Sequence, residues 1–313
     1  MFRGLAPSDN NLRPASEGGF LTKTERACAK RSVCAQVSVP RTSWRGALHR
    51  NQRRFWSLLA SKVTGNAFRV VGNTDTPIIR RIIMKYDFHI HSCLSPCGSD
   101  DMTPANIAGM SFLAGLNAIA VCDHNSSLNI EAAAKACSQY GIRYLCGMEL
   151  CTSEDIHILC YFKDIQAALD FSAHIEENTL KFPNEPQHYG NQNIMDDTDN
   201  ILGTVDHLLI SGCNYSVYEI VDIVHCMGGV CYYAHIDKPS YSVISVLGTI
   251  PEDIAVDGVE IFNIANRERL IAEGYITEDM PYMSNSDAHQ LELIGIKEAQ
   301  MEENHPLLQY LMD

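Results

Sequence analysis

Two histidines one residue apart, His89 and His91, end a stretch (86–92, YDFHIHS) whose alternating and apolar residues predict a β-strand. Side chains two residues apart on a strand point to the same side, so both imidazoles would project together. Imidazole is the commonest metal-ligating side chain. The pair would supply half of the ligands of a metal site. Taken alone it is weak evidence, because 12 histidines in 313 residues also produce such a pair by chance.

Further His, Asp and Glu residues lie in or directly after other short apolar runs that predict strands. They are Asp123 and His124 after residues 118–122, Glu149 after residues 144–148, His157 in the strand that begins at Asp155, His235 after residues 230–234, and Asp287 and His289 after residues 282–285. The carboxyl ends of parallel strands in a barrel meet at one face, where active sites are built. Oxygen and imidazole ligands without a set of thiolates suit Zn, Mn or Fe. The pattern therefore predicts a divalent-metal site at one end of a sheet.

The elements that would position these side chains alternate between strand and helix from Met84 onward. Strands are expected at 85–90, 117–122, 143–152, 155–162, 230–234, 258–262 and 282–285, and helices at 104–115, 129–140, 165–178, 216–227 and 307–312. Repeated strand–helix units favour a parallel sheet, either open or closed into a barrel. Residues 181–214 are rich in Pro, Asn, Asp and Gly, which predicts a long excursion near the site or a small cap.

Charge is spread unevenly along the chain. Residues 1–83 hold 15 Lys and Arg against 4 Asp and Glu, whereas residues 84–313 hold 9 against 34, for a net charge of −14. An acidic body is a poor match for broad adhesion to nucleic acid, which needs a basic surface. A metal cluster could still bind one phosphate, so the expected partner is a small phosphorylated molecule, and nucleic acid only as a nucleotide or short oligonucleotide.

The basic segment 1–83 differs in composition from the body. Its Arg-rich, acid-poor sequence fits an organelle transit peptide, a disordered tail, or an upstream stretch with the natural start at Met84; we favour the last two. Ten of the 12 cysteines lie in the body without zinc-finger spacing, and no secretory leader precedes them, which predicts reduced thiols and a cytoplasmic location. No run approaches the ~18 apolar residues of a membrane span.

The order of the local motifs resembles the PHP family (polymerase and histidinol phosphatase). The matching strings are DFHIHS at 87–92, AVCDHNS at 120–126, GMEL at 147–150, AHIDKPS at 234–240 and NSDAH at 285–289, so the resemblance runs from residue 85 to about residue 296. It implies an α/β fold, a distorted (β/α)7 TIM-like barrel in residues 84–313 that holds two or three divalent metal ions (Zn, Mn or Fe). It also implies a stand-alone, metal-dependent phosphoesterase.

The resemblance also implies a role for each motif residue. One metal would be held by His89, His91, Glu149 and Asp287, a second by Glu149 with His157 and His235, and a third would use His124 and His289. Family members usually offer an acidic residue in the loop after the first motif to complete the third site. Here the loop 95–101 reads SPCGSDD, so Asp100 or Cys97 could take that place, or Cys97 is a loop thiol without a role.

Three further residues are candidates for catalysis or substrate binding. Lys238 follows His235 by three residues and could reach a substrate phosphate and assist catalysis. Asp123 could orient a ligand and so contribute to catalysis, and Asn125 could bind substrate. Arg267 is a weaker candidate, for which a surface role is favoured. Three histidines that lie outside the motifs are expected to be structural: His174, His207 and His225.

The expected function is hydrolysis of a small phosphorylated metabolite or nucleotide by a metal-bound hydroxide. Phosphate-ester hydrolysis is slow enough without a catalyst that concentrated positive charge is the expected solution. Two alternatives remain. The same kind of site could hydrolyse another bond such as an amide, because metal–hydroxide chemistry is not unique to phosphorus. The chain could also be a non-catalytic, metal-stabilised PHP module associated with nucleic-acid enzymes.

Overall fold

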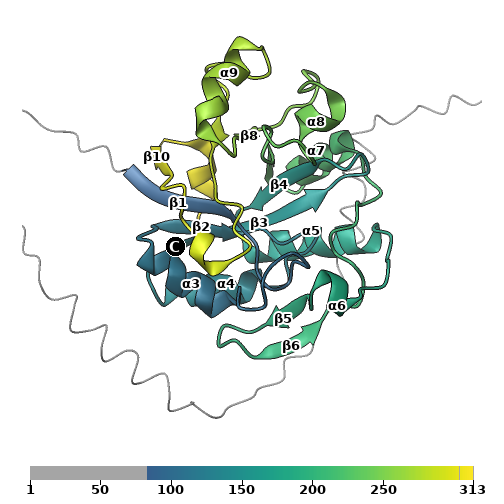
Figure 1. The fold of residues 1–313 in the computed structure, drawn as a ribbon, viewed down its shortest axis with the longest axis vertical. Helices are drawn as coiled ribbons and strands as arrows, with labels where there is room; N and C mark the ends of the chain where they lie inside the picture. The colour runs from purple at the N-terminus through teal and green to yellow at the C-terminus, as the bar shows by residue number, and fades with distance from the viewer. Residues whose placement is uncertain (1–82, 303, 313) are drawn as a thin grey trace, which may run out of the picture.

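Eight strands form one sheet in the order β10-β1-β2-β3-β4-β7-β8-β9 (Figure 1). Their bounds are β1 Ile83–Ile90, β2 Ala118–Val121, β3 Arg143–Cys151, β4 His157–Phe162, β7 Val230–Tyr233, β8 Gly258–Glu260, β9 Tyr282–Met283 and β10 Gln300–Glu302. The computed structural model describes residues 83–302 and 304–312. The expectations for residues 1–82 lie outside the described residues.

The sheet nearly closes on itself between β1 and the segment that follows β9. The chain that continues from β9 forms a parallel bridge between Ile90 and Ala288. The amide of His91 donates to the carbonyl of Ala288 at 2.9 Å, and the amide of Ala288 donates to the carbonyl of His89 at 3.3 Å. Seven strands thus surround a common interior, while β10 lies antiparallel beside the start of β1. The predicted distorted α/β barrel is confirmed.

The expectation of a parallel sheet is wrong at β4, which runs antiparallel to both β3 and β7. The reason is the length of the connection. Only five residues, 152–156, join β3 to β4, and they form a tight turn in which the amide of Asp155 donates to the carbonyl of Thr152 at 3.1 Å. A parallel neighbour would need a crossover of a dozen residues or more. The first residue of β4, His157, therefore lies at the end where the parallel strands finish.

Outside the excursion at 181–214, the described residues form six α-helices: α3 Pro104–Leu113, α4 Ile130–Ser138, α5 Ile165–Glu177, α7 Val217–Cys226, α8 Val243–Leu247 and α9 Arg267–Ala272. Local signals explain where three of the longer ones begin. Thr103, Asp164 and Ser216 each cap a helix with a side-chain oxygen, and Ser216 forms a full capping box with Glu219. Sequence patterns predicted the four longest helices, but missed α8, α9 and β10. The last expected helix is a 3₁₀ segment, Pro306–Tyr310.

Apolar side chains divide into two layers that follow the alternation of the strands. One layer fills the interior and includes Phe88, Leu145 and Tyr161; the other lies between the sheet and the helices and includes Ile90 and Met148. Because side chains alternate across a strand, each strand presents one row of residues to the interior. The cysteines expected in the core are all buried: Cys122, Cys146, Cys160 and Cys231.

The excursion expected at 181–214 contains a short helix α6 (Pro186–Tyr189) and a hairpin of β5 (Asn193–Met195) and β6 (Ile201–Thr204). The hairpin strands pair with each other and lie apart from the barrel sheet (Figure 1). The excursion contacts the loop that follows the first motif, since the amide of Asn193 donates to the carbonyl of Cys93 at 2.9 Å. It therefore supports a loop at the predicted site.

The described residues include no helix that is both long enough and apolar enough to cross a membrane. The ten cysteines of the body, all of them in the described part of the chain, are free of disulfides. A cytoplasmic location stays a prediction.

Candidate metal centre

The inward rows of the strands end in polar residues at the same end of the barrel. On β3 the row runs from Leu145 through Gly147 to Glu149, and on β4 it runs in reverse from Tyr161 to His157. Gly147 leaves no room for a Cβ, which would lie 2.5 Å from the sulfur of Cys122. This close packing fills the space directly below Glu149.

A break in the register of β1 brings the His-x-His pair inside. Phe88 packs in the interior, yet Ile90 packs on the helix side, and the pairing with β2 shifts between Asp87 and Ile90. The carbonyl of Phe88 instead accepts hydrogen bonds from the hydroxyl of Tyr161 at 2.8 Å and the thiol of Cys122 at 3.2 Å. His89 and His91 consequently both face inward, and their Nε2 atoms lie 3.2 Å apart.

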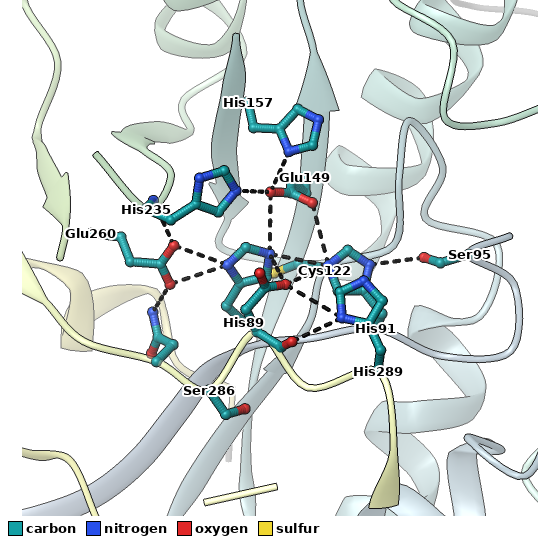
Figure 2. Close-up of polar contacts among 12 residues, drawn as sticks. His89, His91, Ser95, Cys122, Glu149, His157, His235, Glu260, Ser286 and His289 are labelled. Atoms are coloured by element: carbon teal, nitrogen blue, oxygen red, sulfur yellow. Dashed lines mark hydrogen bonds and ion pairs between the residues drawn. The ribbon is translucent and has the colours of Figure 1, made fainter. Parts of the chain in front are cut away.

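Glu149 lies at the centre of the site, between His157 and His235 on one side and the rings of His89 and His91 on the other (Figure 2). Its Oε1 atom is 2.9 Å from Nδ1 of His157, 3.0 Å from Nε2 of His235 and 3.4 Å from Nε2 of His89. Its Oε2 atom is 3.3 Å from Nε2 of His91. One buried carboxylate thus has each oxygen facing imidazole nitrogens.

A second carboxylate, Asp287, faces the His-x-His pair from the end of the barrel seam. Its Oδ1 atom lies 3.2 Å from Nε2 of His91 and 3.5 Å from Nε2 of His89. Its Oδ2 atom accepts a hydrogen bond from the ammonium group of Lys238, which also lies 4.4 Å from the ring centre of Phe262. We call Glu149, His89, His91, His157, His235 and Asp287 the central group.

A further three residues form what we call the loop group: Cys97, His124 and His289. Their ligand atoms and one of His91 all lie within 4.8 Å of one another. The rings of His91 and His289 are stacked with centroids 4.2 Å apart, and the ring of His124 lies 4.6 Å from that of His91. Nδ1 of His124 also lies 3.2 Å from Oε2 of Glu149, so the two groups adjoin. The structure thus brings together all eight side chains that were predicted as metal ligands.

Glu260, which sequence patterns did not identify, orients two members of the central group. Its carboxylate accepts hydrogen bonds from Nδ1 of His89 at 3.1 Å and from the amide of His235 at 2.8 Å, and Asn285 donates to it at 2.8 Å. Glu260 is fully buried at the end of β8. A signal was present, because Glu260 is an acid within the predicted strand 258–262, but the other candidate acids come after their apolar runs and Glu260 lies inside its run.

Asp123 lies beside the centre and holds the loop that follows His91. It accepts hydrogen bonds from the amide and hydroxyl of Ser92 at 2.7 and 2.6 Å and from the hydroxyl of Ser95 at 2.6 Å. Ser95 in turn lies 2.9 Å from Nδ1 of His91 and accepts from the amide of His124 at 3.2 Å. With its oxygens occupied in this way, Asp123 is placed to orient His91 and its loop, and not to act on a substrate itself.

Asn125 has its polar atoms bound within the protein. Its amide donates to the carbonyls of Leu209 and Ser211 at 2.6 and 2.7 Å, and its oxygen accepts from the amide of Cys151 at 2.9 Å. These bonds tie the end of β3 to the excursion. The geometry therefore favours a structural role for Asn125 over the predicted substrate contact.

Arg267 and the three histidines expected to be structural lie outside both groups. Arg267 stacks on Tyr282 and donates to the carbonyl of Glu278. His207 lies 2.9 Å from Glu176, and His225 lies 2.8 Å from Asp257. The remaining one, His174, lies 2.9 Å from the hydroxyl of Tyr215. A surface pocket of about 270 Å³ lies near the start of β1, and none of the predicted site residues lines it.

Burial and mutual charge set the protonation of the centre. Burial alone would lower the pKa of His89, but the carboxylates of Glu260, Glu149 and Asp287 raise it well above its usual value. Burial would raise the pKa of Glu149, but the surrounding histidines hold it well below its usual range. Burial and the nearby His91 lower the pKa of His289 to about 4. The carboxylate of Glu149 is therefore negatively charged and lies among the imidazoles of the site.

The donor atoms fit divalent metal ions. Nδ1 of His124 and Oδ1 of Asp287 are buried and have no hydrogen-bond partner within the described part of the chain, although each lies 3.2 Å from another donor or acceptor of the site. Close approach without hydrogen-bond alignment is expected of atoms whose lone pairs converge on an ion. Asp287 and His235 also have positive φ angles of 54° and 29°, and strained backbone of this kind concentrates at functional sites.

Comparisons with known proteins give partial matches. No family model matches the sequence. A 5′-3′ exoribonuclease from Haemophilus influenzae is 32% identical over 78 residues, which are 24% of this chain and 27% of that protein. The match thus spans about a quarter of the curated relative.

Three solved structures share part of the chain path at low identity. Endonuclease Q from Pyrococcus furiosus has a TM-score of 0.48 at 19% identity, over 67% of this chain and 49% of that one. A candidate metal-dependent phosphoesterase from Bifidobacterium adolescentis has a TM-score of 0.46 at 18% identity, over 66% and 87%. An amidohydrolase from Chromobacterium violaceum has a TM-score of 0.49 at 17% identity, over 73% and 97%. Because these TM-scores lie below 0.5, the chemistry of this chain is inferred from its own site residues.

Proposed function

We propose that this chain is a PHP-family, metal-dependent phosphoesterase that hydrolyses a small phosphorylated metabolite, a nucleotide or the end of a short oligonucleotide. The observation that carries the proposal is the position of Glu149. Its Oε1 atom faces His157, His235 and His89, and its Oε2 atom faces His91 and His124. A carboxylate shared in this way can bridge two cations held by different sets of imidazoles.

Three hydrogen bonds prepare imidazoles to act as ligands. His89 donates from Nδ1 to Glu260, His91 has Nδ1 at the hydroxyl of Ser95, and His289 has Nδ1 2.8 Å from the carbonyl of Asp287. Each contact leaves Nε2 free to bind an ion. When bound, a pair of divalent ions would polarise a phosphoryl group and lower the pKa of a bound water to about 7.

Lys238 supports a phosphate-bearing substrate. Its ammonium group lies at the partly exposed edge of the central group, with a side-chain exposure of 28%, and contacts Asp287 and Phe262. From there it can donate hydrogen bonds to a phosphate oxygen while Asp287 holds the side chain in place. The acidic composition of residues 84–313 favours a compact substrate over a long duplex. The name of the curated relative, a 5′-3′ exoribonuclease, adds a short oligoribonucleotide to the candidate substrates.

The test combines metal content with turnover in the full chain. Metal-loaded protein is expected to contain at least two ions per chain (~2–3) and to release phosphate or nucleotide from a panel of sugar phosphates, nucleotides and short 5′-phosphorylated oligoribonucleotides. His89→Ala should lose turnover and metal while staying folded by circular dichroism, whereas the matched variant His225→Gln, outside both groups, should retain both. Hydrolysis confined to amides, or full turnover of His89→Ala, would overturn the proposal.

A further inference from the structure

The loop group contains a sulfur atom where a purely oxygen and nitrogen site would be expected. Among residues 95–101 two carboxylates, Asp100 and Asp101, could in principle reach the group, together with the thiol of Cys97. Only the thiol belongs to the cluster of ligand atoms that includes His124 and His289. Of the three side chains, the described structure therefore places Cys97 beside the imidazoles, and not Asp100 or Asp101.

Both carboxylates of the loop are engaged on its outer side. The two oxygens of Asp100 each accept from the amide group of Asn191 at 2.9 Å, which ties this exposed side chain to the excursion. Asp101 accepts a hydrogen bond from the hydroxyl of Ser99 and lies on the exposed side as well. Neither side chain lies in a cluster with the imidazoles of the loop group.

The loop is tightly built around the position of Cys97. The amide of Gly98 donates to the carbonyl of Ser95 at 3.0 Å, and a Cβ at Gly98 would lie 2.3 Å from the carbonyl oxygen of Ser92. The amide of Ser99 donates to the carbonyl of His289 at 3.0 Å, so the loop is bonded directly to another residue of the group. Cys97 is thereby held beside the imidazoles by backbone contacts on its carboxyl-terminal side.

From this arrangement we propose that Cys97 is a metal ligand, whose thiolate binds a divalent ion together with His124 and His289. The inference rests on the proposed function, because it assigns a third ion to the same centre. Binding exchanges the thiol proton for the metal, and the proton leaves to solvent. The group has three protein ligands, as catalytic sites do when they keep a position for water or substrate.

The distances require only a small contraction. Zinc lies about 2.3 Å from a thiolate and about 2.0–2.1 Å from an imidazole, so tetrahedral ligand atoms are roughly 3.4–3.7 Å apart. Here the atoms lie within 4.8 Å, and side-chain rotation closes a difference of about one ångström. A thiolate among imidazoles favours Zn²⁺ or Fe²⁺ over Mn²⁺. The loop group should therefore differ in metal preference from the central group, whose candidate ligand atoms are oxygen and nitrogen only.

Cobalt(II) titration of the metal-free full chain tests the assignment without relying on turnover. Thiolate ligation produces a sulfur-to-cobalt charge-transfer band in the near ultraviolet, which imidazole and carboxylate sites lack. Wild type should show the band, and Cys97→Ser should lose it together with one bound ion per chain. The matched control is Cys93→Ser, because Cys93 lies in the same loop but its sulfur faces the carbonyl of Asn193 at 3.9 Å.

A second variant separates ligation from damage to the loop. Cys97→Asp should restore the lost ion without the charge-transfer band and should shift the preference of that ion toward Mn²⁺. Retention of the band by Cys97→Ser, or its absence from cobalt-loaded wild type, would overturn the assignment. If wild type hydrolyses phosphate esters but shows no such band, this inference fails while the proposed function stands; if the chain binds no metal, both fail.

Discussion

The central group and the loop group adjoin but are built in different ways. His89, Glu149 and His235 are 0–3% exposed and lie on barrel strands or within two residues of a strand end. In the loop group Cys97 is exposed, and the side chain of His289 is 29% exposed. The candidate ligands on strands are positioned by the ladder of the whole sheet, whereas Cys97 depends on a few contacts within one loop. A substitution in this loop should therefore change the loop group and leave the central group in place.

The strongest test of this division is Glu149→Gln, because Glu149 contacts imidazoles of both groups. The substitution removes the shared charge, so we expect loss of metal from both groups and a fall in turnover of more than about 100-fold, since loss of an outer hydrogen-bond partner alone costs 10–100-fold. Metal analysis and steady-state kinetics measure this. The matched control is Glu131→Gln, whose side chain is 55% exposed and pairs with Lys135 on α4. Loss from one group only would mean that Glu149 does not bridge them.

Glu260→Gln should affect the central group while sparing the loop group. The amide of His235 and the side chain of Asn285 donate to different oxygens of Glu260, so the substituted amide keeps one acceptor for His89 but turns a donor toward one of these two donors. We therefore expect a loss of turnover of roughly 10–100-fold. Cobalt titration should show that the thiolate band of the loop group persists. Disappearance of that band would show that the two groups do not bind independently.

Gly98→Ala should affect the loop group while sparing the central group. The added methyl group would meet the carbonyl of Ser92, and overpacking of this kind costs about 1–3 kcal/mol of stability. We expect the loop group to lose its ion and the central group to retain its own, as measured by metal content and thermal unfolding. Gly109→Ala is the control, because that position lies in α3 with its nearest contact at 3.6 Å and should be stabilised by about 0.5–1 kcal/mol.

The smallest effect is expected from a histidine outside both groups. The hydrogen bond from His225 to Asp257 raises the pKa of His225 above its usual value. Its stabilisation is thus present below about pH 6.5, the value for an unfolded chain, and is lost as pH rises through the folded pKa. Both side chains are about a third exposed, so the contribution is under about 1 kcal/mol. His225→Gln should flatten the dependence of Tm on pH just above 6.5 without changing metal content; an unchanged slope would contradict this.

Local patterns predicted most of the strands, and they predicted the candidate ligands that the structure places together at the strand ends. The spacing of His89 and His91, and the acids and histidines that follow other apolar runs, were readable because side-chain alternation and burial are properties of each strand alone. The same local logic failed for Glu260, which ends a short strand and lies inside the apolar run predicted there. The role of Glu260 depends on its contact with His89, which lies 171 residues away in the sequence. No local sequence pattern connects the two residues.

Local sequence patterns were enough to predict eight candidate metal ligands, the alternation of strands and helices, and the loop in which a thiol stands near the expected third site. Three features became visible in the three-dimensional fold alone: β4 runs antiparallel, the register of β1 breaks so that both histidines turn inward, and Cys97 rather than Asp100 faces the imidazoles. The physical reason is range. Alternation and capping are set by neighbours in the chain, whereas strand direction, register and side-chain partners are set by contacts between segments far apart in sequence.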